Sequence, residues 1–219
     1  MIRAIFVAIM LALMGVGAAQ TQTLHRLPLA YIPYPINAWK DDNASVGTDT
    51  RYDGTNIPAG AFYYDQHRGV DFGAPYGTTV YASATGTIFL TETTCAPNGG
   101  FRGNTCGFGF GNFVALSHAD GLVSVVAHLS SVSYTTPITC VSGPGGKQLG
   151  VSGNSGDTSG AHLHFELRLT NLSGSSPSYD PFGGSSSTQA FHRWRDWANV
   201  YDTLKGVPFT MPYPTTLCQ

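Results

Sequence analysis

The chain has 219 residues, with 11 lysines and arginines against 13 aspartates and glutamates, which gives a formal net charge of -2. At roughly 100–200 residues per domain, this length predicts one domain with extensions, or at most two small domains. The charge excludes a dominantly electrostatic nucleic-acid binder, and the 12% of aromatic residues argue against disorder. The 27 glycines and 13 prolines predict many turns and therefore favour β structure over a helical bundle.

The first 19 residues follow the order of segments that is typical of a secretory signal peptide. Arg3 precedes an apolar run over residues 4–13, and small residues follow from Gly15 to Ala19. An uncleaved membrane anchor is the alternative, but a spanning helix needs about 20 apolar residues. We therefore expect export to the periplasm or to the extracellular medium, with no membrane contact after cleavage.

Residues 20–60 carry four prolines and predict an irregular N-terminal extension. Two interpretations of this extension stay open. It is either an extended strap that packs on the following domain or a propeptide that blocks a functional site.

From residue 66 to residue 169, short runs rich in β-branched and aromatic residues alternate with Gly-rich turns. This pattern predicts an antiparallel β protein with both long and tight loops. The expected strands, in chain order, are residues 78–82, 87–91, 112–118, 122–129 and 161–169.

After a Ser/Gly-rich loop, apolar residues recur at helical spacing between Ala190 and Leu204. The spacing predicts a C-terminal helix packed on the sheet, ended by Gly206 and Pro208. An aromatic patch that binds a ligand is the alternative. The expected organisation is thus a signal peptide (1–19), an extension (20–60), the main domain (61–185) and a C-terminal helix and tail (186–219).

Four cysteines follow the signal segment, namely Cys95, Cys106, Cys140 and Cys218. An even number of cysteines in an exported chain predicts disulfides, and three pairings are open. Cys95 with Cys106 would close a Gly-rich loop and leave Cys140 for Cys218. Cysteine metal ligands are the weaker interpretation because the chain has no C-x-x-C pair.

The strand expected at residues 161–169 carries two of the seven histidines, His162 and His164. Successive side chains of a strand point to opposite faces, so these two imidazoles share one face with Glu166. The other face is apolar and belongs in the core, through Leu163, Phe165 and Leu167. A strand with such a polar face predicts a small functional site.

His67 and Asp71 lie four residues apart, but Gly69 and Pro75 argue against a helix, so we expect a turn that runs into a strand. Histidine and aspartate are both good ligands of Zn²⁺, and two histidines with one aspartate would leave a fourth position open, as in catalytic zinc sites. Zinc at such a site acidifies water and polarises a carbonyl. Histidines outside the ligand set could accept the proton, which together predicts peptide hydrolysis.

Three ordered segments resemble the lysostaphin/LytM-type zinc metallopeptidases, a family of peptidoglycan endopeptidases. The first segment is His67–Thr78, with the pattern H-x-x-x-D at its start. Residues 111–130 resemble the central hairpin of the family, and residues 150–168 resemble its second signature, which contains His-Leu-His. The resemblance covers roughly residues 66–169, and Asp180 with Pro181 marks the end of the domain.

The resemblance implies a compact antiparallel β-sandwich with a zinc groove across one sheet. It also implies that His67, Asp71 and His164 bind one Zn²⁺ per chain. By the same resemblance, His128 and His162 lie beside the attacking water, as proton acceptor and transition-state stabiliser.

Glu166 is then expected to contact a metal ligand and not the metal itself. The two histidines outside the ligand set, His128 and His162, are better placed to act as the base. For His118 we expect a supporting or structural role, with direct participation as the alternative. Val126 stands where the family commonly has an aromatic residue, which bears on the shape of one groove wall. In the loop of residues 95–111, Phe101, Phe108 and Phe110 either contact substrate or fold inward.

The resemblance implies that the substrate is the peptide stem or cross-bridge of bacterial peptidoglycan, hydrolysed by a zinc endopeptidase. We expect this exported enzyme to be a monomer. Two alternatives remain. One is a secreted zinc protease of Gly-rich proteins, and the other is a non-catalytic module of the same fold that docks on the wall or regulates an amidase.

Overall fold

A computed structural model of the chain describes residues 22–23, 25–29, 31–32, 34–43, 45–51, 55–57, 65–135, 139–140, 147–169, 172, 177–183 and 209–210. The expected signal peptide and C-terminal helix lie outside these residues, as does the expected pairing of Cys140 with Cys218. Within the described part of the chain, no helix has the length and apolar character that crossing a membrane requires.

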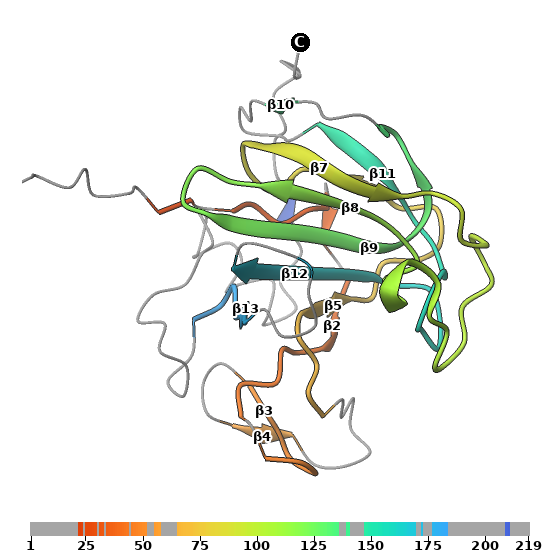
Figure 1. The fold of residues 1–219 in the computed structure, drawn as a ribbon. Coiled ribbons are helices and arrows are strands. Elements are labelled where there is room, and N and C mark those ends of the chain that lie inside the picture. The colour runs from red at the N-terminus through yellow and green to blue at the C-terminus, as the bar shows by residue number, and fades with distance from the viewer. Residues whose placement is uncertain are drawn as a thin grey trace, which may run out of the picture.

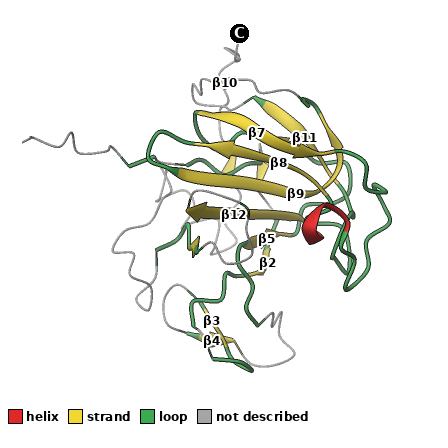
Figure 2. Ribbon diagram, in the orientation of Figure 1, coloured by secondary structure: helices red, strands yellow, loops and turns green. Residues whose placement is uncertain are grey.

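The described residues form short and long strands with one turn of 3₁₀ helix (Figures 1 and 2). The strands are β1 (Tyr31–Ile32), β2 (Ile36–Ala38), β3 (Asp49–Thr50), β4 (Asn56–Ile57), β5 (Val70–Phe72), β6 (Thr79–Tyr81), β7 (Gly86–Glu92), β8 (Asn112–Ser117), β9 (Leu122–Val132), β10 (Thr139–Cys140), β11 (Gln148–Ser152), β12 (Leu163–Leu169), β13 (Ser178–Tyr179) and β14 (Phe209–Thr210). The 3₁₀ turn, η1, is Cys106–Gly109.

One antiparallel sheet dominates the structure, with the strand order β10-β7-β8-β9-β12-β5-β2. β8 and β9 form a hairpin, as the sequence predicted. β9 is the longest strand, and its last residues also pair with β11, which in turn pairs with β6. The expected antiparallel, mostly β architecture is therefore confirmed. β6 and β11 belong to the same hydrogen-bonded sheet as the main strands, because β11 pairs with β9.

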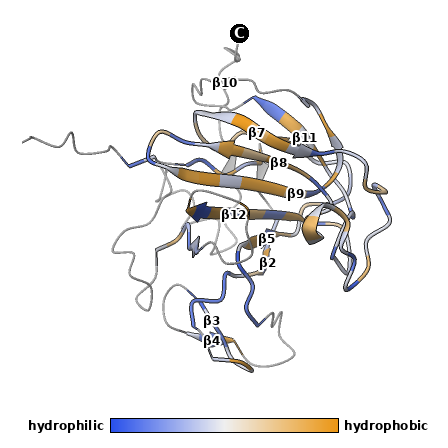
Figure 3. Cartoon of the chain, viewed as in Figure 1, coloured by the Kyte–Doolittle hydropathy of each residue, from blue (hydrophilic) through white to orange (hydrophobic). Residues whose placement is uncertain are grey.

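Both faces of the central strands are buried, which is why β8 and β9 are apolar along most of their length (Figure 3). On one face, β8, β9 and β12 pack against β6, β11 and the segment around Leu29 to form the main core. The apolar side of β12 lies in this core, as expected, through Leu163, Phe165 and Leu167. On the other face, a smaller cluster of Phe113, Ala115, Val123, Val125 and Ala127 lies beside the functional groove.

The N-terminal extension is more regular than its prolines predicted. Its strand β2 pairs antiparallel with β5 at the edge of the main sheet. Proline is tolerated there because an edge strand leaves part of its backbone without a ladder partner. The Pro35 carbonyl even accepts a hydrogen bond from Gly73 N, at 2.8 Å.

A disulfide joins Cys95 to Cys106, one of the three pairings that the sequence left open. It closes the Gly-rich loop of residues 95–111, which also contains η1. Asn112 fixes the base of this loop, because its side chain accepts a hydrogen bond from Cys95 N and donates one to the Cys95 carbonyl, both at 2.9 Å. The loop is therefore held at both ends.

Candidate metal centre

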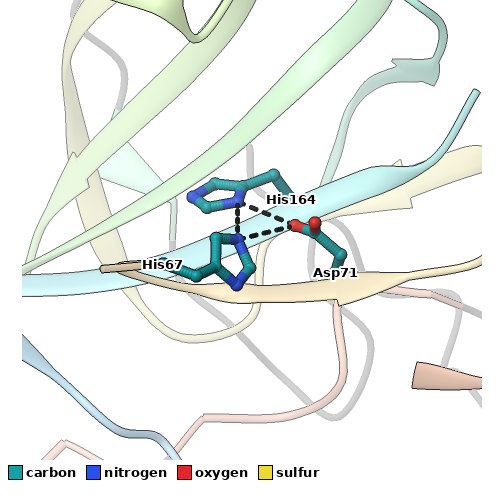
Figure 4. A group of neighbouring side chains, drawn as sticks. All are labelled: His67, Asp71 and His164. Atoms are coloured by element: carbon teal, nitrogen blue, oxygen red, sulfur yellow. Dashed lines mark hydrogen bonds and ion pairs between the residues drawn. The ribbon is translucent and has the colours of Figure 1, made fainter. Parts of the chain in front are cut away.

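Strand pairing brings the carboxylate and one imidazole of the candidate centre together. β5 and β12 run antiparallel with Asp71 directly opposite His164, and such cross-strand neighbours contact each other. His67 lies in the turn that enters β5 and reaches the same point, so the three side chains face one another (Figure 4). Gly69 permits this approach, because a Cβ at that position would lie 2.6 Å from His164 Cε1.

The three donor atoms have the separations that a tetrahedral ion requires. His67 Nε2 lies 3.2 Å from His164 Nδ1 and 3.2 Å from Asp71 Oδ1, and His164 Nδ1 lies 2.8 Å from Asp71 Oδ1. Zinc bonds of about 2.1 Å in a tetrahedron place neighbouring ligand atoms about 3.4 Å apart. All three side chains are buried, so the donor set fits a zinc ion with a further coordination position.

The outer nitrogen of each imidazole has its own partner, which determines which nitrogen faces the centre. His67 Nδ1 donates to the Trp39 carbonyl at 2.7 Å, so its Nε2 lone pair points inward. In His164 the roles of the two nitrogens are reversed: Nε2 lies 3.4 Å from Glu166 Oε2, and Nδ1 points toward the centre. Partners of this kind orient metal-binding histidines and raise their basicity.

Glu166 is almost fully buried and is bound by arginine. Arg168 donates to both of its carboxylate oxygens, at 2.7 and 3.3 Å, and Arg68 Nε lies 3.6 Å from Oε1. Burial alone would raise the pKa of Glu166, but the hydrogen bonds and charges of His164 and Arg168 lower it. Glu166 is therefore a buried carboxylate beside His164, and the supporting role expected for it stays a prediction.

The charges at the centre stabilise an ionised Asp71. Burial alone would raise the pKa of its carboxyl, but the charges of His67 and His162 and hydrogen bonds with the imidazoles of His164 and His67 hold it well below its usual value. Burial also acts to lower the pKa of His164, yet its hydrogen bonds to Asp71 and Glu166 raise that pKa to about 9. The centre thus contains ionised carboxylates, Asp71 and Glu166, that favour a positive charge at His164.

A β-bulge brings His128 into the same groove. Asn112 pairs with Leu129 and Val114 pairs with Val126, so two residues of β9 oppose the single residue Phe113. The extra residue is His128, which has a φ of 60°. Without the bulge, alternation would place His128 on the core face with Val126; bulges re-aim side chains in this way.

His128 is neutral and has one nitrogen available. Burial, followed by the charges of His162 and His164, lowers its pKa to about 3. Its Nδ1 donates to the Ser155 carbonyl at 2.8 Å, which leaves the Nε2 lone pair as a proton acceptor.

His162 lies next to His128, with their ring centroids 4.6 Å apart. Its Nδ1 donates to the Gly160 carbonyl at 2.8 Å, and its Nε2 lies 3.5 Å from Asp71 Oδ2. The structure therefore brings all five residues of the expected constellation into one groove.

The groove has a volume of about 540 Å³, and its walls come from distant parts of the chain. The lining includes Asn37, Ala38 and residues 65–68, together with residues 157–161 and part of the disulfide-closed loop.

The three phenylalanines of that loop have different environments. Phe108 lines the groove and is 80% exposed. Phe110 also lines the groove but packs inward, with its ring 5.5 Å from that of Phe113 and 5.2 Å from the Arg168 guanidinium. Phe101 is exposed but is not among the described residues that line the groove. Of the two interpretations left open by the sequence, substrate contact therefore suits Phe108, and inward folding describes Phe110.

His118 lies on the opposite face of the sheet from the metal centre. Its Nδ1 donates to the Thr85 carbonyl at 2.7 Å, and its Nε2 lies 2.8 Å from Ser124 Oγ. Its ring also packs against that of His25, 4.8 Å away between centroids. These contacts favour the structural role among those that the sequence analysis left open.

Residues 65–177, just over half of the chain, match the family described as Peptidase family M23. The chain belongs to this family. The part that matches M23 contains His67, Asp71, His128, His162 and His164. The strand β2 and the Trp39 carbonyl lie before it.

Two curated relatives of the M23 chain share about a third of its residues over the matched region. The DD-carboxypeptidase/endopeptidase Mpg of Neisseria meningitidis is 37% identical over 103 residues, 47% of this chain and 20% of Mpg. The peptidoglycan DD-endopeptidase ShyA of Vibrio cholerae is 32% identical over 101 residues, 46% of this chain and 20% of ShyA. The aligned part thus spans about a fifth of the length of these relatives.

Among solved structures, the catalytic domain of lysostaphin from Staphylococcus simulans is similar to this M23 chain. The two are 27% identical with a TM-score of 0.42, over 54% of this chain and 77% of that domain.

Two contributors to the centre carry no signal in the sequence. The Trp39 carbonyl and the Ser155 carbonyl orient His67 and His128 through the backbone. Every residue has such a carbonyl, so residue type cannot mark these two acceptors.

Proposed function

We propose that the protein is an exported zinc metallopeptidase that hydrolyses amide bonds in the peptide stems or cross-bridges of bacterial peptidoglycan. The observation that carries the proposal is the convergence of three metal-ligand side chains and two further histidines in one groove. Family membership supports a peptidase. The similarity to Mpg, a DD-carboxypeptidase/endopeptidase, and to ShyA, a peptidoglycan DD-endopeptidase, supports the substrate class.

His67, Asp71 and His164 would hold one zinc ion. Zinc bound there supplies a Lewis acid that acidifies water and polarises the scissile carbonyl. The three side chains keep their donor atoms directed inward through Trp39, Glu166 and the strand pairing of β5 with β12. This preorganisation leaves little rearrangement to the reaction itself.

His128 acts as the proton acceptor. The hydrogen bond from its Nδ1 to the Ser155 carbonyl keeps the Nε2 lone pair unprotonated. A neutral imidazole in a groove can take a proton from the attacking water and pass it to the leaving amine.

His162 acts as the stabiliser of the transition state. Its Nδ1 is held by the Gly160 carbonyl, and its Nε2 faces the centre beside Asp71. When protonated, it presents a cationic N–H to the negative charge that develops on the substrate oxygen.

The test is mass spectrometry of the fragments that the mature protein releases from purified peptidoglycan, with and without a chelator. We expect chelator-sensitive release of peptide-cleaved fragments, whose new termini identify the bond. His128→Ala and His162→Ala are expected to retain zinc and to lose about 10²- to 10⁴-fold in rate, the usual contribution of a catalytic acid or base.

Other outcomes would point elsewhere. Stoichiometric zinc without release from any type of peptidoglycan would overturn the wall-hydrolase proposal in favour of a docking module. Cleavage of a Gly-rich protein such as elastin, with intact peptidoglycan, would favour a secreted protease of broader range.

A further inference from the structure

A short piece of the N-terminal extension lies directly beside the metal centre. Ala38 of β2 pairs with Asp71 of β5, and Asn37 and Ala38 line the groove. The backbone then passes the imidazole of His67. This piece lies before residue 65, where the match to family M23 begins.

Three hydrogen bonds join this piece to the turn that carries His67. The Trp39 carbonyl accepts from His67 Nδ1 at 2.7 Å. Asp41 N donates to the His67 carbonyl at 2.8 Å, and Asp41 Oδ2 accepts from Gln66 N at 3.0 Å. The extension thus binds the turn on both sides of its metal ligand.

The turn needs this support because its backbone is strained. Gln66 has a φ of 62°, in the left-handed region that residues other than glycine rarely adopt. Such conformations persist where the surroundings enforce them. Asp41 is suited to this task because it is buried and its Oδ1 also accepts from Asn43 N and Thr50 N, at 3.2 and 3.1 Å.

The side chain of Trp39 anchors the same piece. Its indole packs edge-on against Phe182, with ring centroids 5.1 Å apart, and the Arg51 guanidinium lies 5.4 Å from its ring. Contacts with Phe182 and Arg51 therefore hold Trp39, and with it the carbonyl that accepts the hydrogen bond from His67.

We propose that residues 37–41 are a positioning element of the metal centre, which holds His67 in the orientation and tautomer that present Nε2 to the metal. The inference rests on the proposed zinc centre and deepens it. A histidine whose Nδ1–H is bound to a fixed carbonyl keeps a single nitrogen available for a metal. The consequence is opposite to that of a propeptide, since loosening this element weakens zinc binding and does not unmask activity.

Asp41→Ala in the full mature chain tests the inference without altering a ligand. The zinc dissociation constant is measured by competition with a chromophoric chelator. We expect it to rise about 10- to 100-fold, the usual effect of losing a group that orients a metal ligand. Val46→Ala is the matched control, because Val46 is 79% exposed in the same extension; its dissociation constant should equal that of the wild type.

A second measurement needs only the wild-type protein. In ¹⁵N NMR spectra of the histidine rings, we expect His67 to be protonated at Nδ1, with slow solvent exchange of that proton. Rapid exchange of this proton would overturn the inference, even if Asp41→Ala does not fold.

An unchanged zinc dissociation constant in folded Asp41→Ala would overturn it as well. Tighter zinc binding or higher activity in that variant would favour the propeptide interpretation instead. Wild-type protein that binds no zinc would overturn the proposed metal centre itself, and this inference with it.

Discussion

Phe108 combines two features that rarely occur in one residue. It is 80% exposed at the groove, and its φ is 60°. A left-handed conformation costs a residue other than glycine roughly 1–2 kcal/mol. The neighbouring backbone enforces it, because Phe110 N donates to the Gly107 carbonyl and Gly111 N donates to the Cys106 carbonyl within the disulfide-closed loop. Backbone strain is common at functional sites, so we expect the exposed Phe108 ring to contact the substrate.

Phe108→Gly therefore separates stability from function. Glycine relieves the strain, so we expect the free energy of unfolding to rise by about 1 kcal/mol. The same variant loses the ring, and burial of a phenylalanine side chain contributes about 1.5–3 kcal/mol. We expect at least a tenfold lower kcat/KM, mainly through KM, measured on a peptidoglycan stem peptide.

Two further variants sharpen this prediction. Phe108→Ala loses the ring but keeps the strain, and should reduce kcat/KM without the gain in stability. Phe101→Ala removes an exposed ring from the same loop outside the groove and should leave kcat/KM unchanged. A more stable Phe108→Gly with normal kcat/KM would show that the ring does not touch the substrate.

At the scale of elements, the sequence predicted which side chains face the groove in the regular strand β12, but not in β9, which contains a bulge. β12 has no bulge before residue 169, so simple alternation correctly placed His162, His164 and Glu166 on the groove side. β9 contains the bulge at His128, which turns His128 to the groove, whereas Val126, just before the bulge, lies in the core. Val126 therefore does not shape the groove wall, contrary to the expectation from the family comparison. No residue type marks this bulge, because its left-handed position is filled by histidine where glycine would be usual.

The N-terminal extension shows a different limit of prediction. Its prolines indicated irregular chain, whereas tertiary pairing with β5 makes residues 36–38 a strand. The intrinsic β-propensity of a segment is a weak guide at a sheet edge, because pairing with the neighbouring strand determines whether the segment becomes a strand. The even number of cysteines predicted disulfides but left their pairing open, because cysteine count does not determine connectivity; the structure joins Cys95 to Cys106. The C-terminal helix and the signal peptide stay predictions.

His118 contacts residues in or beside three strands, and its buried position in the folded chain favours the neutral imidazole. It follows β8, binds Ser124 of β9 and binds the Thr85 carbonyl before β7. Burial lowers its pKa, although the Thr85 carbonyl and the charge of Asp120 oppose this shift. The unfolded chain takes up a proton at an ordinary pKa of about 6.5, above the folded value, so acid favours unfolding. The contribution of His118 to stability is complete above about pH 6.5 and falls as the pH drops below that value.

His118→Gln is expected to reveal this dependence. The difference in unfolding free energy between wild type and variant should be largest at pH 7.5. It should shrink below pH 6.5 by up to about 1.4 kcal/mol for each pH unit. Urea denaturation in the presence of a chelator at pH 7.5, 6.5 and 5.5 measures it. A difference that stays constant with pH would mean that His118 titrates alike in the folded and unfolded chains.

At the scale of the whole molecule, the candidate centre joins segments that are distant in the chain. His67 and Asp71 come from the entry to β5 and from β5 itself, and His164 follows nearly a hundred residues later on β12. The N-terminal extension also contributes to the centre, because β2 pairs with β5 and the Trp39 carbonyl accepts a hydrogen bond from His67. An ion that binds all three ligands stabilises only the folded arrangement, because the unfolded chain does not bring them together.

Zinc should therefore raise the stability of the whole domain in proportion to the logarithm of its concentration. At a free concentration 100 times the dissociation constant, the expected gain is about 2.7 kcal/mol. Thermal unfolding monitored with and without zinc measures it, and His164→Ala is expected to lose the gain because one ligand is missing. Weak binding by histidines of the unfolded chain would reduce the gain in both proteins alike, so the contrast between them isolates the assembled centre. An equal gain in both would mean that zinc binds elsewhere, and the three residues would then lose their assignment as ligands.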